Sequence, residues 1–382
     1  MIARTARTFV ARSAPPLTLA IAATLASAGS VLGHGDVPSE PPTAATLAFA
    51  WTIEPAVAIP LLGLAALWIW AVRRVDRAHP AHPVPRRRSV AFLGGLAAIT
   101  IALLSGIERY DTTLFSVHMV QHLLLALVAA PLLALGAPVT LLLRVLPAPD
   151  RRRFVLPLLH SRALRIATHP IMAWLVFAGV MWGTHFSPLF DAALEDRGLH
   201  DLEHLLYLGA GLLFWWPAVA ADPAPRRLAH PVRILYVFLQ MPQNTFLAVT
   251  LLNAGQPLYP HYETLRRSWG PSPLEDQQIA AGIMWLGGDL LFLAAVFALI
   301  ASWMRAEERS TAAADRRSDA SRAAIDDRAA RLAVSRGAQG NAGAGRADRS
   351  AGADRGAGSV SAAPESEPPG TPDSAPDPRS RR

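Results

Sequence analysis

Apolar runs of about 20 residues, separated by short arginine-rich segments, constrain the fold of this chain most strongly. A helix of that length spans the hydrocarbon core of a bilayer and satisfies its own backbone hydrogen bonds there. Of the 382 residues, 52% are hydrophobic and 17% are charged. A soluble domain has about 25% charged residues. The sequence therefore predicts an all-α polytopic membrane protein.

We predict a bundle of about seven transmembrane helices, because seven apolar runs follow one another along residues 34–305. The predicted spans are 46–72, 89–107, 113–135, 166–186, 201–220, 231–254 and 277–304.

The distribution of arginine predicts the orientation of these spans. Loops 73–88 and 136–165 each contain six arginines, and the connection 221–233 contains three. The loops on the opposite side contain one or two arginines each. Because cytoplasmic loops carry the excess of positive charge, the mature N-terminus is expected outside and the C-terminus in the cytoplasm. This placement also accounts for the pI near 10.7, so no nucleic-acid partner is expected.

Two terminal segments differ from the apolar region. Residues 1–33 combine three arginines, a short apolar core and small-residue cleavage sites, which predicts a secretory signal peptide or an N-terminal anchor. Residues 306–382 are rich in Ala, Arg, Asp, Gly, Ser and Pro, and they predict a disordered cytoplasmic tail with some local helix open near 318–334. The seven-helix domain is expected over 34–305.

Two histidine pairs carry the candidate chemistry. HMVQH at 118–122 and HDLEH at 200–204 each place two histidines four residues apart at the outer end of an apolar run. On a helix this spacing puts both imidazoles on one face, where they can bind one metal ion. For a single pair, interfacial anchoring or hydrogen bonding between helices is the favoured explanation of the spacing. Two pairs at matching depth favour a metal site.

The full set of predicted metal ligands adds a fifth histidine at the outer end of the fourth span. The set is His118, His122, His185, His200 and His204. The chain has no cysteine, which excludes disulfides, thiolate metal sites, iron–sulfur clusters and c-type haem attachment. Nitrogen ligands alone favour copper, zinc, iron or nickel.

Four acidic residues are predicted to support the site or another polar position in the membrane. Asp201 and Glu203 lie between the histidines of the second pair and could orient them. Asp191 belongs to an acidic outer loop. Asp289 lies near the middle of the last span, an expensive position that predicts a polar partner such as Gln240, Gln243 or Asn244.

Four separate blocks resemble the multispan CtaG family of cytochrome c oxidase assembly factors. They are HMVQHLLLALVAAPLLALGAP, MWGTHFSPLFDAALEDRGLHDLEHLLYLGAGLLFWWP, PLYPHY and DQQIAAGIMWLGGD, and the resemblance covers about residues 45–305. It implies a bacterial plasma-membrane protein, not an enzyme, that assists a haem–copper oxidase and handles copper at the outer face. Its implied partners are the oxidase subunits, copper chaperones and the lipid bilayer.

The resemblance also assigns residues to the family's positions. These are the five histidines already named, together with Asp191, Asp276, Gln277 and Asp289. Two other functions stay open at this point. Asp289 with Gln240 and Asn244 could belong to a metal or proton transporter, and facing histidines could hold haem in a membrane cytochrome.

Overall fold

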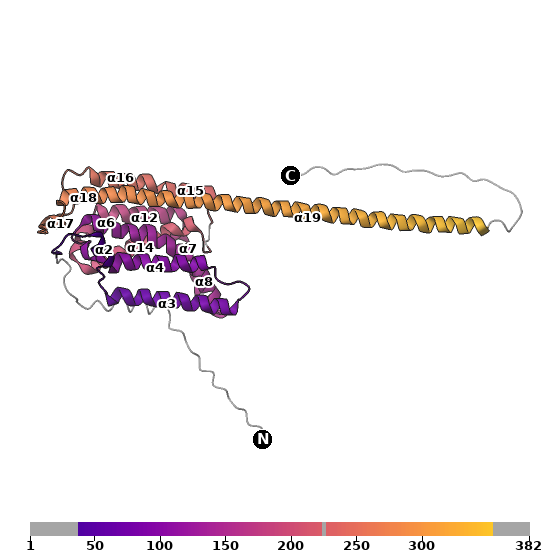
Figure 1. Ribbon diagram of the computed structural model, residues 1–382, viewed down its shortest axis with the longest axis horizontal. Coiled ribbons are helices and arrows are strands. Elements are labelled where there is room, and N and C mark those ends of the chain that lie inside the picture. Colours follow the sequence, from indigo (N-terminus) through magenta and orange to yellow (C-terminus); the bar gives the residue numbers. More distant parts are fainter. Residues whose placement is uncertain (1–36, 224–226, 354–382) are drawn as a thin grey trace, which may run out of the picture. The chain divides into compact units, whose positions relative to one another are not determined.

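The computed structural model describes residues 37–223 and 227–353, with side chains as far as residue 332 (Figure 1). Within these ranges every regular element is a helix, as predicted. The predicted signal peptide or anchor, residues 1–33, lies outside the described residues, as do residues 354–382. Contacts within the chain define two compact units, residues 1–305 and residues 306–382.

The helices of the first half are α2 (Ala44–Phe49), α3 (Pro55–Ala78), α4 (Arg86–Leu104), α5 (Gly106–Tyr110), α6 (Phe115–Leu123), η1 (Leu124–Ala129), α7 (Ala130–Gly136), α8 (Pro138–Val145), α9 (Ala148–Asp150), η2 (Arg151–Val155), α10 (Leu156–Leu159) and α11 (Arg162–Ala167). Those of the second half are α12 (Pro170–His185), α13 (Pro188–Glu195), α14 (Arg197–Val219), α15 (His230–Phe238), α16 (Gln240–Leu252), α17 (Pro260–Thr264), α18 (Pro273–Gly282), η3 (Ile283–Gly287) and α19 (Gly288–Ala353). The segments η1, η2 and η3 are π-helical.

Five helical runs in the described residues are long and apolar enough to cross a membrane. They are Pro55–Ala78, Arg86–Tyr110, Phe115–Val145, His230–Leu252 and Pro273–Leu332. The other two predicted spans correspond to α12 and α14. Helix α12 has only 16 residues, and α14 has 23 residues but begins with a polar turn that carries histidines and acids.

The first predicted span, 46–72, is placed too early. The structure has the short helix α2 at Ala44–Phe49, an extended link, and then α3 from Pro55. The cause is the Glu54–Pro55 pair: proline disfavours helical backbone in the residue before it but suits the first helical position. Glu54 is extended accordingly. The connection predicted as a loop at 136–165 is folded into the short helices α8 to α11 and η2.

The predicted disorder of the tail is wrong for residues 306–353, which continue α19 as a helix. Alanine and arginine, the main residues of this segment, have high helix propensity. Two pairs on the helix surface, Arg322 with Asp319 and Arg331 with Asp327, have the three- and four-residue spacing that supports a helix.

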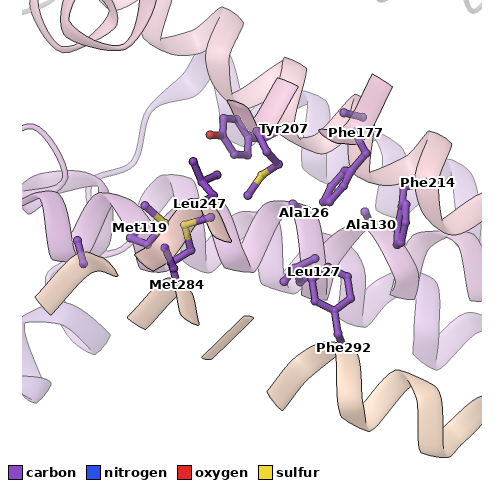
Figure 2. Packing of buried hydrophobic residues seen from close by; sticks show 14 of the residues in the cluster. Met119, Ala126, Leu127, Ala130, Phe177, Tyr207, Phe214, Leu247, Met284 and Phe292 are labelled. Atoms are coloured by element: carbon purple, nitrogen blue, oxygen red, sulfur yellow. The ribbon is translucent and has the colours of Figure 1, made fainter. Parts of the chain in front are cut away.

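The core lies between α6, η1 and α7 on one side and α12, α14, α16 and α18 on the others (Figure 2). Phe177, Phe214 and Phe292 fill it with large buried rings. At the cytoplasmic ends predicted from arginine, α3 packs on α4 and α8. Helix α3 is the least covered span, since only 17% of its apolar window is buried.

One close approach fixes how α14 meets the π-helical segment after HMVQH. Gly211 leaves no room for a side chain, because a Cβ there would lie 3.0 Å from both the Ala126 carbonyl oxygen and the Ala130 Cβ. One turn further, the Trp215 indole N–H donates to the same Ala126 oxygen at 2.9 Å. A π turn changes the i→i−4 hydrogen-bond pattern, and here one of its carbonyls accepts from the neighbouring helix. The contact brings the histidine ends of α6 and α14 together.

Candidate metal centre

Helix α6 begins at Phe115 because a carboxylate from another helix caps it. Asp276 of α18 accepts hydrogen bonds from the backbone N–H of Phe115 at 2.6 Å and of Ser116 at 3.4 Å. A charge-assisted cap of this kind satisfies amides that a helix terminus leaves unpaired. One turn later, His118 and His122 lie on one face of α6, and both are buried.

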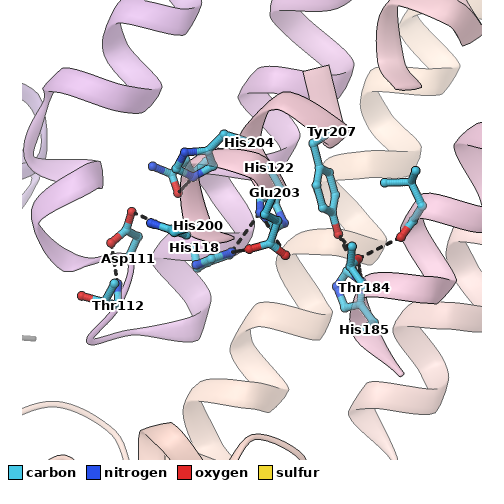
Figure 3. A network of polar contacts seen from close by, with 12 residues as sticks. Asp111, Thr112, His118, His122, Thr184, His185, His200, Glu203, His204 and Tyr207 are labelled. Carbon is cyan, nitrogen blue, oxygen red and sulfur yellow. Dashed lines mark hydrogen bonds and ion pairs between the residues drawn. The ribbon is translucent and has the colours of Figure 1, made fainter. Parts of the chain in front are cut away.

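Helix α14 begins with a cap of its own. The Asp196 side chain accepts from the Leu199 N–H at 2.9 Å, which is the usual arrangement at a helix N-terminus. His200, Glu203 and His204 follow on one face and are buried, Glu203 completely. The two histidine pairs therefore meet across the interface of α6 and α14 (Figure 3).

The centre of this interface is a set of imidazoles around one carboxylate. The Nε2 atoms of His118 and His122 lie 2.9 Å apart. Oε2 of Glu203 lies 3.5 Å from Nε2 of His118, and Oε1 lies 3.9 Å from Nε2 of His122. The His118 and His200 rings are 5.3 Å apart between centroids. Glu203, predicted as a supporting residue, is therefore placed between the predicted ligands.

An outer-loop acid that was not among the predicted site residues completes the cluster. Asp111, in the turn between α5 and α6, lies 3.7 Å from Nε2 of His200 through its Oδ2. It is 1% exposed, and burial raises the pKa of its carboxyl to about 8. A nearby cation would favour the ionised carboxylate and offset that effect.

Two groups of three residues could each hold a metal ion. Asp111, His200 and His204 form one, and His118, His200 and Glu203 form the other; in each, one ligand atom per residue lies within 4.8 Å of the others. Four-coordinate metals with bonds of about 2.0–2.1 Å separate their ligand atoms by about 3.3 Å. The His118–Glu203 separation of 3.5 Å is close to this value, so modest side-chain rotation would bring the donors together.

The donor atoms in this cluster fit a metal ion. Neither carboxylate oxygen of Glu203 has a hydrogen-bond partner among the described residues, and the same is true of Asp111 Oδ2. Buried carboxylate oxygens without partners are costly unless a cation or a donor satisfies them. Imidazole nitrogen and carboxylate oxygen are common ligands of copper and zinc.

Gln121, which the sequence reading also missed, orients one of the ligands. Its amide nitrogen donates to the Ala102 carbonyl at 3.1 Å and to Oε2 of Glu108 at 2.7 Å. Its oxygen must therefore face His204, whose Nε2 lies 3.0 Å away. Nε2 of His204 carries the hydrogen and donates it, which leaves the lone pair on Nδ1.

His185 is not part of either group of three. Its Nδ1 donates to the Met181 carbonyl at 2.7 Å, and Nε2 is buried without a hydrogen-bond partner in the described residues. Tyr207 links it to the cluster, because this ring stacks on His122 at 3.7 Å between centroids and its hydroxyl lies 3.3 Å from Nδ1 of His185. His185 therefore borders the cluster through Tyr207 (Figure 3).

The other three acidic residues predicted to support the site lie outside both groups of possible ligands. Asp191 accepts from the backbone N–H of His261 at 3.0 Å and holds the last outer loop. Asp201 is exposed on α14. Asp289 accepts from Asn244 at 3.1 Å and from Thr245 at 2.7 Å, so Asn244, one of its three predicted partners, pairs with it.

The fold and the buried cluster define a helical membrane protein with a histidine–carboxylate centre between two helices. The profile of the cytochrome c oxidase caa3 assembly factor family, Caa3_CtaG, matches residues 66–306. The chain belongs to this family, which confirms the predicted resemblance.

Three mycobacterial proteins are similar to most of the chain. The uncharacterized proteins Mb0105 of Mycobacterium bovis and MT0111 of Mycobacterium tuberculosis are each 32% identical over 287 residues. The uncharacterized protein ML1998 of Mycobacterium leprae is 31% identical over 294 residues. These stretches cover 73% and 75% of this chain but only 43% and 44% of the relatives. No solved structure matches the chain.

Proposed function

We propose that this assembly factor holds a copper ion transiently in the histidine–carboxylate cluster and passes it to a haem–copper oxidase at the outer face of the bacterial plasma membrane. The observation that carries the proposal is the convergence of four histidines and two carboxylates from distant parts of the chain. The family connects the chain to oxidase assembly, and such an oxidase contains copper. Copper is the cargo here, and the protein is not expected to act as an enzyme.

Binding by this cluster would proceed through neutral imidazoles. Each histidine must present a lone pair, so protonation competes with the metal. Gln121 sets one tautomer by accepting from Nε2 of His204. Glu203 and Asp111 supply negative charge that balances the ion. Transfer would exchange these ligands one at a time for those of an oxidase subunit or of a copper chaperone. The bundle that holds the cluster would cross the membrane with seven helices.

The test is metal analysis of the purified protein beside a variant with His118, His122, His200 and His204 all changed to alanine. The wild type should copurify with, or take up, copper, and the variant should not. Oxidase activity in a strain that carries only the variant should fall as well. Equal copper content in both proteins would reject the site, and normal oxidase in the variant strain would reject its role in assembly.

The two other functions have less support. A haem needs room for a macrocycle between axial histidines on facing helices, whereas the Glu203 carboxylate of α14 lies 3.5 Å from Nε2 of His118 and 3.9 Å from Nε2 of His122 on α6. In a transporter, Asp289 would be expected to face an open path, whereas both of its oxygens accept hydrogen bonds from α16. A haem spectrum and metal uptake into proteoliposomes would detect these two activities directly.

A further inference from the structure

A basic groove lies at the far end of the Phe115–Val145 run from the histidine cluster. It has a volume of about 570 Å³ and lies between the last turns of α3 and the end of α8. Arg74, Arg77 and Arg144 line it, together with Trp70 and the apolar side chains of Val75 and Val145. No acidic side chain lines the groove in the described part of the chain.

The three arginines keep most of their donors available. Nε of Arg77 donates to the Arg73 carbonyl at 3.1 Å, and Nη2 of Arg144 donates to the His82 carbonyl. The guanidinium of Arg74 lies over the Trp70 ring, 5.6 Å from its centroid. The ion pairs found among the described residues involve none of these three arginines. Because a guanidinium offers five N–H donors, most of them remain for a ligand.

The acid nearest in sequence does not line the groove. Asp76 lies between Arg74 and Arg77 in the sequence, but its Oδ1 accepts from the backbone N–H of Val84 at 2.7 Å. It therefore ties the α3–α4 connection and is not a lining residue. An anion that enters the groove would meet three positive charges from two helices.

The position of the groove identifies the anion. Helix α3 has 24 residues and is long and apolar enough to cross a membrane, and the groove lies at its last two turns. The outward side chains of α3 above it are apolar and exposed, including Ile59 at 68% and Leu62 at 70%. Trp70 is 49% exposed beside the groove, and tryptophan is common at membrane interfaces.

We propose that this groove binds the phosphodiester headgroup of an anionic phospholipid, with the acyl chains lying along the apolar face of α3. Guanidinium groups match phosphate oxygens with paired hydrogen bonds, and basic pockets between helices at the cytoplasmic side bind such headgroups. Trp70 and the floor formed by Val75 and Val145 contact the glycerol and the first methylenes. The site is separate from the histidine cluster and does not depend on copper binding.

The experiment is native mass spectrometry of the full-length protein in neutral detergent with added phosphatidylglycerol or phosphatidylcholine. The wild type should bind phosphatidylglycerol, and the double variant Arg74→Gln/Arg77→Gln should bind it at least about tenfold more weakly. Arg144→Gln tests the second wall of the groove and should weaken binding as well. The matched control is Arg152→Gln/Arg153→Gln, which removes two exposed arginines of η2 outside the groove and should bind like the wild type.

Three results would overturn the proposal. The groove variants could bind phosphatidylglycerol as the wild type does, or the wild type could bind phosphatidylcholine equally well. Inorganic phosphate, added as a competitor, could displace the lipid at comparable concentration, which would make free phosphate the ligand. Unfolding temperatures of all variants, measured in the same detergent without lipid, should agree within a few degrees. A loss of lipid binding then reports the loss of the groove and not the unfolding of the protein.

Discussion

At the scale of single residues, hydrogen bonds around the cluster decide which atoms are available to a metal. Gln121 accepts from Nε2 of His204, and its own N–H groups are committed to Ala102 and Glu108. The residue lies inside HMVQH, one position before the second histidine. An orienting partner of this kind contributes to metal affinity without binding the metal itself.

Replacing Gln121 by methionine should weaken metal binding about 10- to 100-fold while the helices remain intact, because His204 loses the acceptor that fixes its tautomer. Competition with a chelator measures the affinity, and circular dichroism measures the helix content. Gln243→Met is the matched control, since Gln243 pairs with Gln240 on α16 away from the cluster. Unchanged affinity in Gln121→Met would show that the orientation of His204 does not matter.

Glu203→Gln should change two properties in opposite directions. The carboxylate is fully buried, and neither oxygen has a hydrogen-bond partner in the described residues. Without metal the neutral amide is less costly to bury, so the metal-free variant should be at least as stable as the wild type. With metal the variant loses a ligand and a negative charge, so the affinity for Cu²⁺ should fall at least about tenfold.

Thermal unfolding with and without copper measures both effects for Glu203→Gln. The wild type should gain more in unfolding temperature from copper than the variant does, since the stabilisation of the folded state by a ligand rises with the logarithm of its affinity. Asp201→Asn, on the exposed side of the same turn, is the control and should behave like the wild type. A variant that keeps its affinity for copper would place the metal away from Glu203.

At the scale of helices, the sequence predicts which side chains share a face but not which faces meet. The four-residue spacing of His118 with His122, and of His200 with His204, follows from the helical repeat. Depth in the membrane suggested His185 as a fifth ligand, but it lies outside both groups of three, next to Tyr207, whose ring stacks on His122. The rotation of α12 about its own axis decides whether His185 faces the cluster. The helical repeat of the sequence does not determine how a helix is rotated relative to its neighbour.

Asp111 shows that sequence periodicity also misses a site residue that lies outside a helix. It lies in a turn with no repeat around it and reaches His200, which is 89 positions later in the chain. The packing of α14 on η1 and α7, through Gly211 and Trp215, brings the two together. The helix ends that proline determines, such as the start of α3 at Pro55, are local features that the sequence does contain.

The cap on α6 gives a prediction at this scale. Asp276→Asn removes the charged acceptor of the Phe115 and Ser116 amides, which should cost about 1–2 kcal/mol of stability at the start of the histidine helix. Hydrogen exchange of the first turn of α6 should become faster, and copper affinity should fall as His118 loses its fixed position. Glu275→Gln, which changes the exposed cap of α18 itself, is the control. Slow exchange in Asp276→Asn would mean that packing alone holds the turn.

At the scale of the whole molecule, the histidine cluster and all but the last residue of the family match fall in the first of the two compact units. The unit ends at Arg305, and the match ends at residue 306. The chain covers less than half the length of its mycobacterial relatives, so this region is combined with other sequence in those proteins. The part of α19 after residue 305 is exposed almost throughout its described side chains, and it contributes no residue to the core clusters.

A chain that ends after Arg305 should therefore keep the function of the full-length protein. We expect equal copper content per mole, equal unfolding temperature within a few degrees, and normal assembly of the oxidase when the shortened protein is the only copy in the cell. The oxidase is measured by its haem spectrum and by its activity in isolated membranes, with the amount of assembly factor determined by immunoblot. If the shortened protein reaches the membrane in normal amount and binds copper but the oxidase is missing, the helix beyond Arg305 takes part in delivery, and the cluster alone is insufficient.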